Sequence, residues 1–319
     1  MLKKIINSAH INLKIIPVDP LLIKSSQATV GGVDMSFVRT YRFGEKDEPY
    51  IPGSSLKGMI RSYGEKICRS LRDSPVPVCL PYVDYGKEQE GQKGQTACGL
   101  RFEKYKRQRE VSAEEVYRLS CPACRLFGSH NFIGRFAASD AYLTEAFKTK
   151  RLLEIRDGVA IDRITGGTAG GAKYDLEVLT SSEFYTTLEI RNFERWQLGL
   201  IGLILRDMEQ GLLRIGYGKS RGLGRIQAEI SEFKLTYYNK KVSHLAGIHA
   251  LSSVKDRENY KLFNEITSTS TSLPEPQLNG LRYEYLITDK WKEILEPGVS
   301  DLVSYIEKVD WPSAIERII

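Results

Sequence analysis

The sequence predicts an α+β fold in which one antiparallel sheet carries helices on one face. Apolar and polar residues alternate from Ala9 to Ile15, which is typical of a half-buried strand. Apolar residues recur at helical spacing from Leu56 to Leu71, and a second helical segment spans Trp196–Met208. The chain therefore runs strand, helix, strands, helix, strand, and a ferredoxin-like arrangement is the simplest topology that fits this order.

The first helix is predicted to begin within residues 52–55, with a serine as its N-cap. Its apolar face is formed by Leu56, Met59, Ile60, Tyr63, Ile67 and Leu71. Another strand is expected at Phe184–Ile190, and the alternation of Ile226, Ala228 and Ile230 with polar residues indicates a final core strand.

These elements divide the chain into a core, residues 1–240, and a C-terminal extension, residues 241–319. Within the core, residues 73–130 form a polar, irregular insertion that holds four of the five cysteines. A segment this long without clear periodicity needs something to fold around. Residues 155–185 contain paired glycines and are predicted to form a flexible hairpin. Residues 279–319 are predicted to be a small, mainly helical appendage.

The composition permits a nucleic-acid partner without requiring one, because Lys and Arg number 46 against 40 Asp and Glu. No apolar run approaches the roughly 20 residues that span a bilayer, and the N-terminus does not have the pattern of a signal peptide. An odd number of cysteines, two of them in a Cys-x-x-Cys pair, indicates a reducing compartment and no disulfide framework. We therefore expect a cytoplasmic protein without a membrane partner.

The start of the first helix combines features that attract anions. Ser54 and Ser55 lie at the helix N-terminus, where free N–H groups and the helix dipole favour negative charge. Lys57 and Arg61 are four residues apart and share one helix face. These residues can hold phosphates; the alternative is a capped amphipathic helix with a solvated basic face.

A glycine-rich basic segment, Arg214–Arg225, is a second candidate anion site. It is not a phosphate-binding loop of the P-loop class, because residue 213 is Leu where that motif requires Gly. Nor is it a dinucleotide fingerprint starting at Gly216, because residue 221 is Arg. A polymeric phosphate backbone remains, since it needs a groove and positive charge. The alternative is a tight glycine-rich turn between strands.

The cysteines of the insertion suggest a zinc site. A Cys-x-x-Cys pair can chelate one zinc ion, and two further thiolates complete a tetrahedron. The predicted ligands are Cys79, Cys98, Cys121 and Cys124. His130 is an alternative fourth ligand, and a reduced set of thiols without metal is the main rival. Cys68, inside the first helix, is expected to be a packed core thiol.

Asp34 follows two glycines, a position that usually marks a turn. It can also act with a divalent cation on a phosphate. No histidine is close to it in the sequence, although His10 on the first strand stays a candidate for acid–base chemistry. The segment Ala160–Leu179 has apolar side chains that can wedge between stacked bases or pack against a neighbouring subunit.

Together these motifs resemble the RAMP superfamily of CRISPR-associated proteins. The helix-opening segment 52–61 and the glycine-rich segment 214–225 are similar to two signatures of that family. Residues 162–167 followed by 174–177 resemble the thumb hairpin of its backbone subunits, and residues 121–129 resemble their zinc-proximal segment. The order of the motifs is similar to that of the repeated backbone subunit of type III effector complexes.

The resemblance implies an RRM-like, ferredoxin-like core with a zinc-bearing insertion and a thumb hairpin. Such subunits stack along a guide RNA beside other CRISPR effector subunits, and the thumb kinks the duplex of guide and target RNA. Carried onto this chain, the resemblance assigns RNA contacts to Ser54, Ser55, Lys57, Arg61, Arg163, Lys219, Arg221 and Arg225.

In cleaving members of this family a loop aspartate cuts target RNA with a divalent metal, and the matching residue here is Asp34. The resemblance thus implies a metal-dependent endoribonuclease that uses Mg²⁺ or Mn²⁺. One alternative is a structural subunit that binds guide RNA without cutting. Another is a guide-processing endoribonuclease, a class that usually relies on acid–base chemistry with His.

Overall fold

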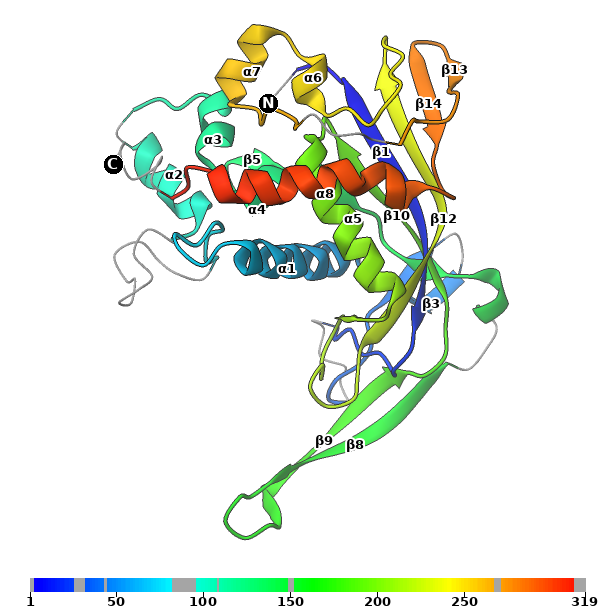
Figure 1. Ribbon diagram of the computed structural model, residues 1–319. Helices are drawn as coiled ribbons and strands as arrows, with labels where there is room; N and C mark the ends of the chain where they lie inside the picture. The colour runs from blue at the N-terminus through cyan, green and yellow to red at the C-terminus, as the bar shows by residue number, and fades with distance from the viewer. Residues whose placement is uncertain are drawn as a thin grey trace.

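The computed structural model places one antiparallel sheet beside a layer of helices (Figure 1). Strand β1 (Asn7–Pro17) lies at its centre, between β10 (Phe184–Arg191) and β12 (Arg225–Tyr238). The predicted mixed α+β class with an antiparallel sheet is confirmed. The described residues are 3–25, 32–42, 45–81, 96–107, 109–148, 152–266 and 271–312.

The sheet runs β13–β14–β12–β1–β10–β6, and every pairing along it is antiparallel. Ile11 on β1 lies between Leu188 and Phe233 of its two neighbours. The side chains of β1 that the sequence pattern turns inward are fully buried, which confirms the predicted alternation: Ala9, Ile11, Leu13 and Ile15. The outer strands are β6 (Phe136–Ala138), β13 (Gln277–Asn279) and β14 (Arg282–Leu286), and short strands β7 (Tyr142–Leu143) and β11 (Leu213–Arg214) pair with β10 and β12.

Three long helices lie on one side of this sheet in Figure 1. They are α1 (Gly53–Leu71), α5 (Arg195–Glu209) and α8 (Trp291–Lys308). Helix α5 packs along α8 and contacts β12, and α1 contacts both of these helices as well as β6. Along the chain the core elements follow the order β1, α1, β6, β10, α5, β12, while the same four strands stand in the sheet as β12–β1–β10–β6.

Helix α1 begins differently from the prediction of a serine N-cap. The N-cap is Pro52, and Gly53 is already helical. A Cβ atom on Gly53 would overlap the carbonyl oxygen of Ala138, so only glycine allows this close approach of the two backbones. The Gly53 N–H donates to Asp140 Oδ1 at 2.7 Å. The carboxylate of Asp140, distant in sequence, therefore provides the cap that the sequence assigned to a serine.

The cysteine-bearing insertion is more regular than its sequence suggests. It contains the short helices α2 (Cys98–Lys106), α3 (Ala113–Leu119) and α4 (Pro122–Phe127), followed by the hairpin of β4 (Gly128–Ser129) and β5 (Phe132–Ile133). Ser112 caps α3 by accepting a hydrogen bond from the N–H of Glu115 at 3.2 Å. Each helix is too short to show a full apolar stripe, which explains why periodicity does not reveal it.

A long hairpin projects from the sheet, as Figure 1 shows. Its strands are β8 (Leu153–Ile161) and β9 (Thr168–Leu179). Apolar side chains on it face solvent, and Ile164 near the turn is 95% exposed. The remaining small elements before it are β2 (Arg39–Arg42), β3 (Glu45–Pro49) and the 3₁₀ helix η1 (Glu145–Phe147).

The described part of residues 279–319 is mainly helical, as predicted, because α8 has 18 residues, but it also contributes a strand to the main sheet. Strand β14 pairs with β12 from Lys234 to Tyr238 and so extends the main sheet. Helices α6 (Ile248–Leu251) and α7 (Val254–Tyr260) precede it, and α8 packs along α5. The sequence signal for β14 is weak because the strand has only five residues and its two tyrosines are the inward-facing positions.

Candidate metal centre and nucleic-acid interface

Four cysteine side chains from separate elements meet in the insertion. Their sulfur atoms all lie within 4.8 Å of one another, and all four residues are buried. Cys79 follows α1, Cys98 opens α2, and Cys121 and Cys124 belong to the first turn of α4. The set comprises Cys79, Cys98, Cys121 and Cys124, as the sequence predicted.

The spacing of the sulfur atoms fits a tetrahedral metal ion. Cys79 Sγ lies 3.7 Å from Cys121 Sγ and 3.7 Å from Cys124 Sγ. Zn–S bonds of about 2.3 Å in a tetrahedron place sulfur atoms about 3.8 Å apart. None of these cysteines is in a disulfide. The four thiols can therefore bind a metal such as zinc, and a full set of protein ligands would make such a site structural.

Backbone and side-chain donors already point at these sulfur atoms. The N–H of Cys121 donates to Cys98 Sγ at 3.3 Å, and the N–H of Cys124 donates to Cys121 Sγ at 3.4 Å. Such bonds stabilise thiolates, the form in which cysteine binds metal. The hydrogen bond from the Cys121 thiol is the main cause that lowers the pKa of Cys79, whereas burial raises the pKa of Cys98.

Arg61 joins helix α1 to this cluster. Its Nη2 donates to Cys124 Sγ at 3.4 Å, its Nη1 to the carbonyl of Gly128 at 3.0 Å, and its Nε to Glu65 Oε1 at 2.9 Å. Burial acts to lower the pKa of the guanidinium, but the neighbouring Cys124 sulfur and Glu65 carboxylate outweigh it and the pKa is raised. The sequence predicts only an RNA-binding role for Arg61. Its helical spacing does not reveal the contact with Cys124, which is 63 residues away.

The two other candidate residues near the cysteines lie outside the cluster. His130 is exposed and does not belong to the group of residues that could hold a metal, which consists of four cysteines. Cys68 is fully buried in the core, as predicted, and burial raises the pKa of its thiol to about 12.

At the start of α1 the predicted anion-binding residues are only partly available. Ser54 is exposed, whereas the N–H of Ser55 donates to the carbonyl of Pro52 at 2.9 Å. Lys57 is half-buried and its Nζ donates to the carbonyl of Phe136 at 3.1 Å. Burial, followed by the charge of Arg61, lowers the pKa of Lys57. The Asp140 carboxylate already occupies the first N–H of this helix.

The glycine-rich segment forms a loop held tightly to the neighbouring backbone. Gly216 and Gly224 both have positive φ, 84° in each case, and a Cβ atom on either would overlap a carbonyl oxygen. The N–H of Tyr217 donates to the carbonyl of Leu22 at 2.7 Å, and the N–H of Gly224 donates to the carbonyl of Pro20 at 2.9 Å. These two N–H groups are therefore used within the fold and are not available to an anion.

The basic side chains of this loop differ in whether they are bonded to other residues. Lys219 is exposed at the loop tip. Arg221 Nη1 donates to the hydroxyl of Tyr174 on β9 at 2.7 Å. Arg225 Nη2 lies 3.3 Å from Asp19 Oδ1, and Asp19 also pairs with Arg214 at 2.9 Å. Asp19 was not singled out from the sequence, because only the folded chain brings it beside residues about 200 positions later.

Asp34 lies against the base of the projecting hairpin. Its Oδ2 accepts a hydrogen bond from the N–H of Asp175 on β9 at 3.1 Å, and the residue is exposed. The adjacent Met35 bonds with Asp175 and Glu177 of the same strand. The pKa of Asp175 is raised, mainly by its hydrogen bond with the Asp157 carboxyl and to a smaller degree by the charge of Asp34.

The hairpin base brings two predicted sites together. Tyr174 contacts Arg221 of the glycine-rich loop, and the next residue of β9, Asp175, contacts Asp34. Arg163 lies apart from both, exposed in the turn of the hairpin. His10 is also elsewhere: it lies on β1 with its Nε2 3.8 Å from Glu189 Oε1 on β10.

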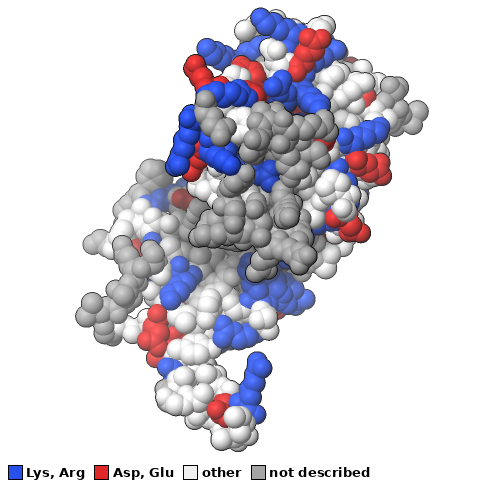
Figure 2. All heavy atoms as spheres, turned by 90° about the vertical axis from the view of Figure 1, so that its left-hand side faces the viewer, with Lys and Arg blue, Asp and Glu red and all other residues white. Residues whose placement is uncertain are grey.

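Figure 2 shows the distribution of charge over one face of the molecule. Lys and Arg side chains lie on the part of this face above the projecting hairpin, with acidic side chains between them. The net excess of basic residues is therefore spread over a mixed surface, which agrees with its modest size. No helix within the described ranges is long and apolar enough to cross a membrane.

Comparison with known protein families shows which family this chain belongs to. The family description "RAMP superfamily" matches residues 16–227, which is two thirds of the chain. The chain belongs to the RAMP superfamily. A search of curated proteins finds no match. Membership in the RAMP superfamily implies a CRISPR-associated role in RNA binding, in a family that includes some members with ribonuclease activity. The matched residues include the cysteine cluster, Asp34, the hairpin and the whole glycine-rich loop.

Proposed function

We propose that this RAMP protein is a backbone subunit of a type III CRISPR effector complex, that it binds guide RNA, and that it cleaves complementary target RNA with a divalent metal through Asp34. Its core is a ferredoxin-like, RRM-like unit, since the four core strands stand in the order β12–β1–β10–β6, with the first and third strands of the chain at the centre. The metal is Mg²⁺ or Mn²⁺, and the complex works in the cytoplasm beside other effector subunits.

The observation that carries the proposal is the meeting of two sites at the hairpin base. Arg221 and Asp34 are bonded to consecutive residues of β9. A guide strand held by Lys219 and Arg221 would therefore run past the base of the thumb. A target strand paired with that guide would bring its phosphates towards the exposed Asp34 carboxylate. One oxygen of this carboxylate accepts a backbone N–H, and the other oxygen would help to hold a divalent cation, which would polarise a phosphate of the target.

The remaining predicted contacts support the same path. Ser54 and Lys57 at the start of α1, and Arg163 in the hairpin turn, present polar or basic groups to RNA. Arg61 and Arg225 contribute through their positions, since both are tied to protein partners in the free chain. A zinc ion on the four cysteines fixes α2 and α4 against α1, and Arg61 connects that centre to the RNA-binding helix.

Cleavage is tested with Asp34→Asn in the assembled complex containing guide and complementary RNA. We expect loss of Mg²⁺- or Mn²⁺-dependent cutting, while the complex still assembles and binds target. Asp73→Asn is the matched control, because Asp73 is an exposed carboxylate beyond the C-terminal end of α1. Unchanged cutting by the Asp34 variant would remove this residue from catalysis.

The second candidate is a structural subunit that binds guide RNA without cutting. It is favoured by the hydrogen bond from Asp175 to Asp34, since that bond lets the carboxylate simply fasten the 32–38 segment to the hairpin. Under this reading the wild-type complex makes no cut assignable to this subunit. Asp34→Ala, which removes the acceptor that Asn would keep, would then lower the stability of the hairpin base and leave every cleavage product in place.

A further inference from the structure

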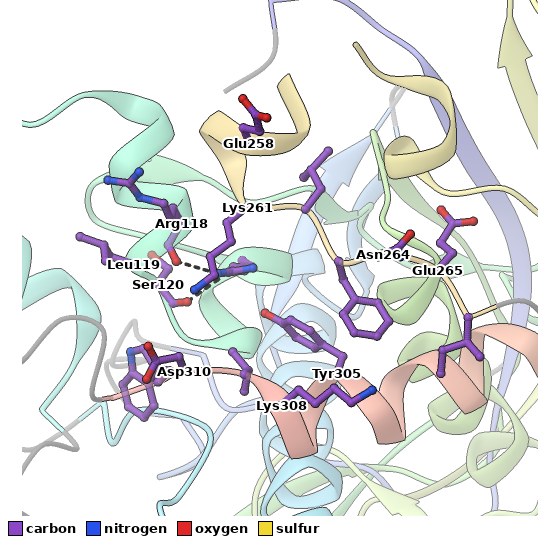
Figure 3. Close-up of a pocket in the computed structure, with 16 residues that line it drawn as sticks. Arg118, Leu119, Ser120, Glu258, Lys261, Asn264, Glu265, Tyr305, Lys308 and Asp310 are labelled. Carbon is purple, nitrogen blue, oxygen red and sulfur yellow. Dashed lines mark hydrogen bonds between the residues drawn. The ribbon is translucent and has the colours of Figure 1, made fainter. Parts of the chain in front are cut away.

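A cavity lies between the insertion and the C-terminal region, away from the glycine-rich loop. It has a volume of about 830 Å³, which is within the range of small-molecule sites. Figure 3 shows its walls, which come from α3, from the segment that follows α7, and from the end of α8. Most of its lining lies beyond residue 227, outside the part that matches the family. Nothing in the proposed function uses this cavity.

Two buried donors in the cavity wall have no partner among the described residues. Tyr305 is 4% exposed and Trp311 is 2% exposed. Neither the phenol hydroxyl of Tyr305 nor the indole Nε1 of Trp311 makes a hydrogen bond to any described group. A buried polar group without a partner costs about 1–3 kcal/mol, so both positions call for a ligand or water. In Figure 3 the Tyr305 hydroxyl points into the space below Lys261.

A buried cation stands beside these donors. Arg125 is 3% exposed and lines the cavity. Its Nε and Nη2 donate to the carbonyls of Ser120 and Arg118, at 3.2 and 2.6 Å, which fixes the plane of the guanidinium. Its carbon centre lies 5.7 Å from the ring centroid of Tyr305. No carboxylate of the described residues lies within ion-pair distance of it, so its charge is open to an anion.

The rim of the cavity adds further positive charge. Lys261 and Lys308 are exposed and line the opening. Of the acidic lining residues, Glu265 already accepts the N–H of Gly247 at 2.8 Å and lies 3.8 Å from Arg195. The Glu258 carboxylate points away from the cavity in Figure 3. Asp310 also lines the cavity, so four basic and three acidic residues form its wall and the balance of charge is positive.

One wall is aromatic. Phe263 packs edge-on against Tyr305 with ring centroids 5.4 Å apart, and Trp311 also lines the cavity. A planar ring can pack on such a wall, and its anionic group can reach the basic side chains.

From these features we propose that this cavity binds a nucleotide, with its phosphate held by Arg125, Lys261 and Lys308 and its base against Phe263. A phosphate offers several acceptor oxygens and matches a site lined by donors. An acidic peptide fits less well, because its backbone N–H groups need acceptors and the nearby carbonyls of Arg118 and Ser120 are already bonded to Arg125. The nucleotide is either free or the phosphorylated end of an RNA strand.

The test is titration of the full chain with a fluorescent analogue of AMP, followed by competition. Lys261→Gln and Lys308→Gln should each weaken binding about tenfold, the effect of one charge-assisted hydrogen bond. Tyr305→Phe removes only the hydroxyl and should weaken binding about fivefold. Lys255→Gln is the matched control, since Lys255 is an exposed lysine on α7 that does not line the cavity. Thermal melting of each variant checks that the fold is kept.

The competitors separate the two sources of the nucleotide. Displacement by a short RNA with a 5′-phosphate, but not by the same RNA with a 5′-hydroxyl, supports an RNA end. Displacement by unlabelled AMP alone supports a free nucleotide. Four results overturn the proposal: no binding, equal binding by all variants, inorganic phosphate as effective as AMP, or an acidic peptide more effective than AMP. Because the titration contains no guide or target RNA duplex, its failure leaves the proposed backbone function untouched.

Discussion

The close crossing of α5 and α8 depends on two facing glycines, Gly199 and Gly298. The structure shows how large an overlap a side chain at this crossing would cause. A Cβ atom on Gly199 would overlap the carbonyl of Gly298 and lie 2.5 Å from the backbone nitrogen of Val299. Ordinary van der Waals contact begins at 3.4 Å and the nearest atoms, the carbonyl C and O of Gly298, would lie 2.1 Å away, so Gly199→Ala must move the helices apart by about 3.4 − 2.1 = 1.3 Å. A gap above about 1 Å forfeits about half or more of each contact across it.

The expected cost of Gly199→Ala is about 2–4 kcal/mol in the free energy of unfolding, because overpacking costs about 1–3 kcal/mol and the interface also loses contacts. Gly58→Ala is the matched control. Gly58 is also inside a helix, but a Cβ atom there would meet nothing within 4 Å. Without a clash, alanine should stabilise the helix by about 0.5–1 kcal/mol.

The assay is urea unfolding of both variants and the wild type, with the midpoints compared. We expect a lower midpoint for Gly199→Ala and an equal or higher midpoint for Gly58→Ala. If Gly199→Ala unfolds at the wild-type midpoint, the close packing of α8 on α5 is wrong. The attachment of the C-terminal region to the sheet-bearing core would then need another basis.

Three further predictions follow from buried groups and from the loop. Cys121→Ser should reduce bound zinc from about one ion per chain to none in metal analysis, and zinc retained at full occupancy would refute the four-cysteine site. Burial raises the pKa of Glu265 from 4.5 to about 7, so the folded state holds more protons than the unfolded state between these values; stability should fall as pH rises through that window, and Glu265→Gln should flatten the slope. Lys219→Ala should reduce the slope of log binding constant against log salt by about 0.7 for single-stranded RNA, and an unchanged slope would mean that this lysine holds no phosphate.

The parts of the fold that could be predicted are those written in local patterns. The alternation of β1 and the helical spacing of α1 each bury one face, so the sequence alone carries their signal. The Cys-x-x-Cys pair could also be predicted from a local pattern, because its spacing places both thiols on the first turn of α4. The glycines of the 214–225 loop mark positive φ at positions where side chains would clash.

What could not be predicted depends on contacts between distant segments. The capping of α1 by Asp140, the pairing of Asp19 with two arginines, and the bond from Arg61 to Cys124 have no local signature. Strand β14 is also of this kind, because a five-residue strand gains its place through pairing with β12. The cavity described above is lined by three segments, and none of them carries a sequence motif that indicates a ligand site.

The pairing of β14 with β12 also determines how this protein can meet its neighbours. On one side the sheet ends in β13, which has three residues, and on the other in β6 and β7, which have three and two. Among the described strands, neither edge offers a long row of free backbone groups for a second chain. The two ends of the main sheet are therefore poorly suited to strand pairing with a second chain, whereas the separate hairpin has strands of 9 and 12 residues.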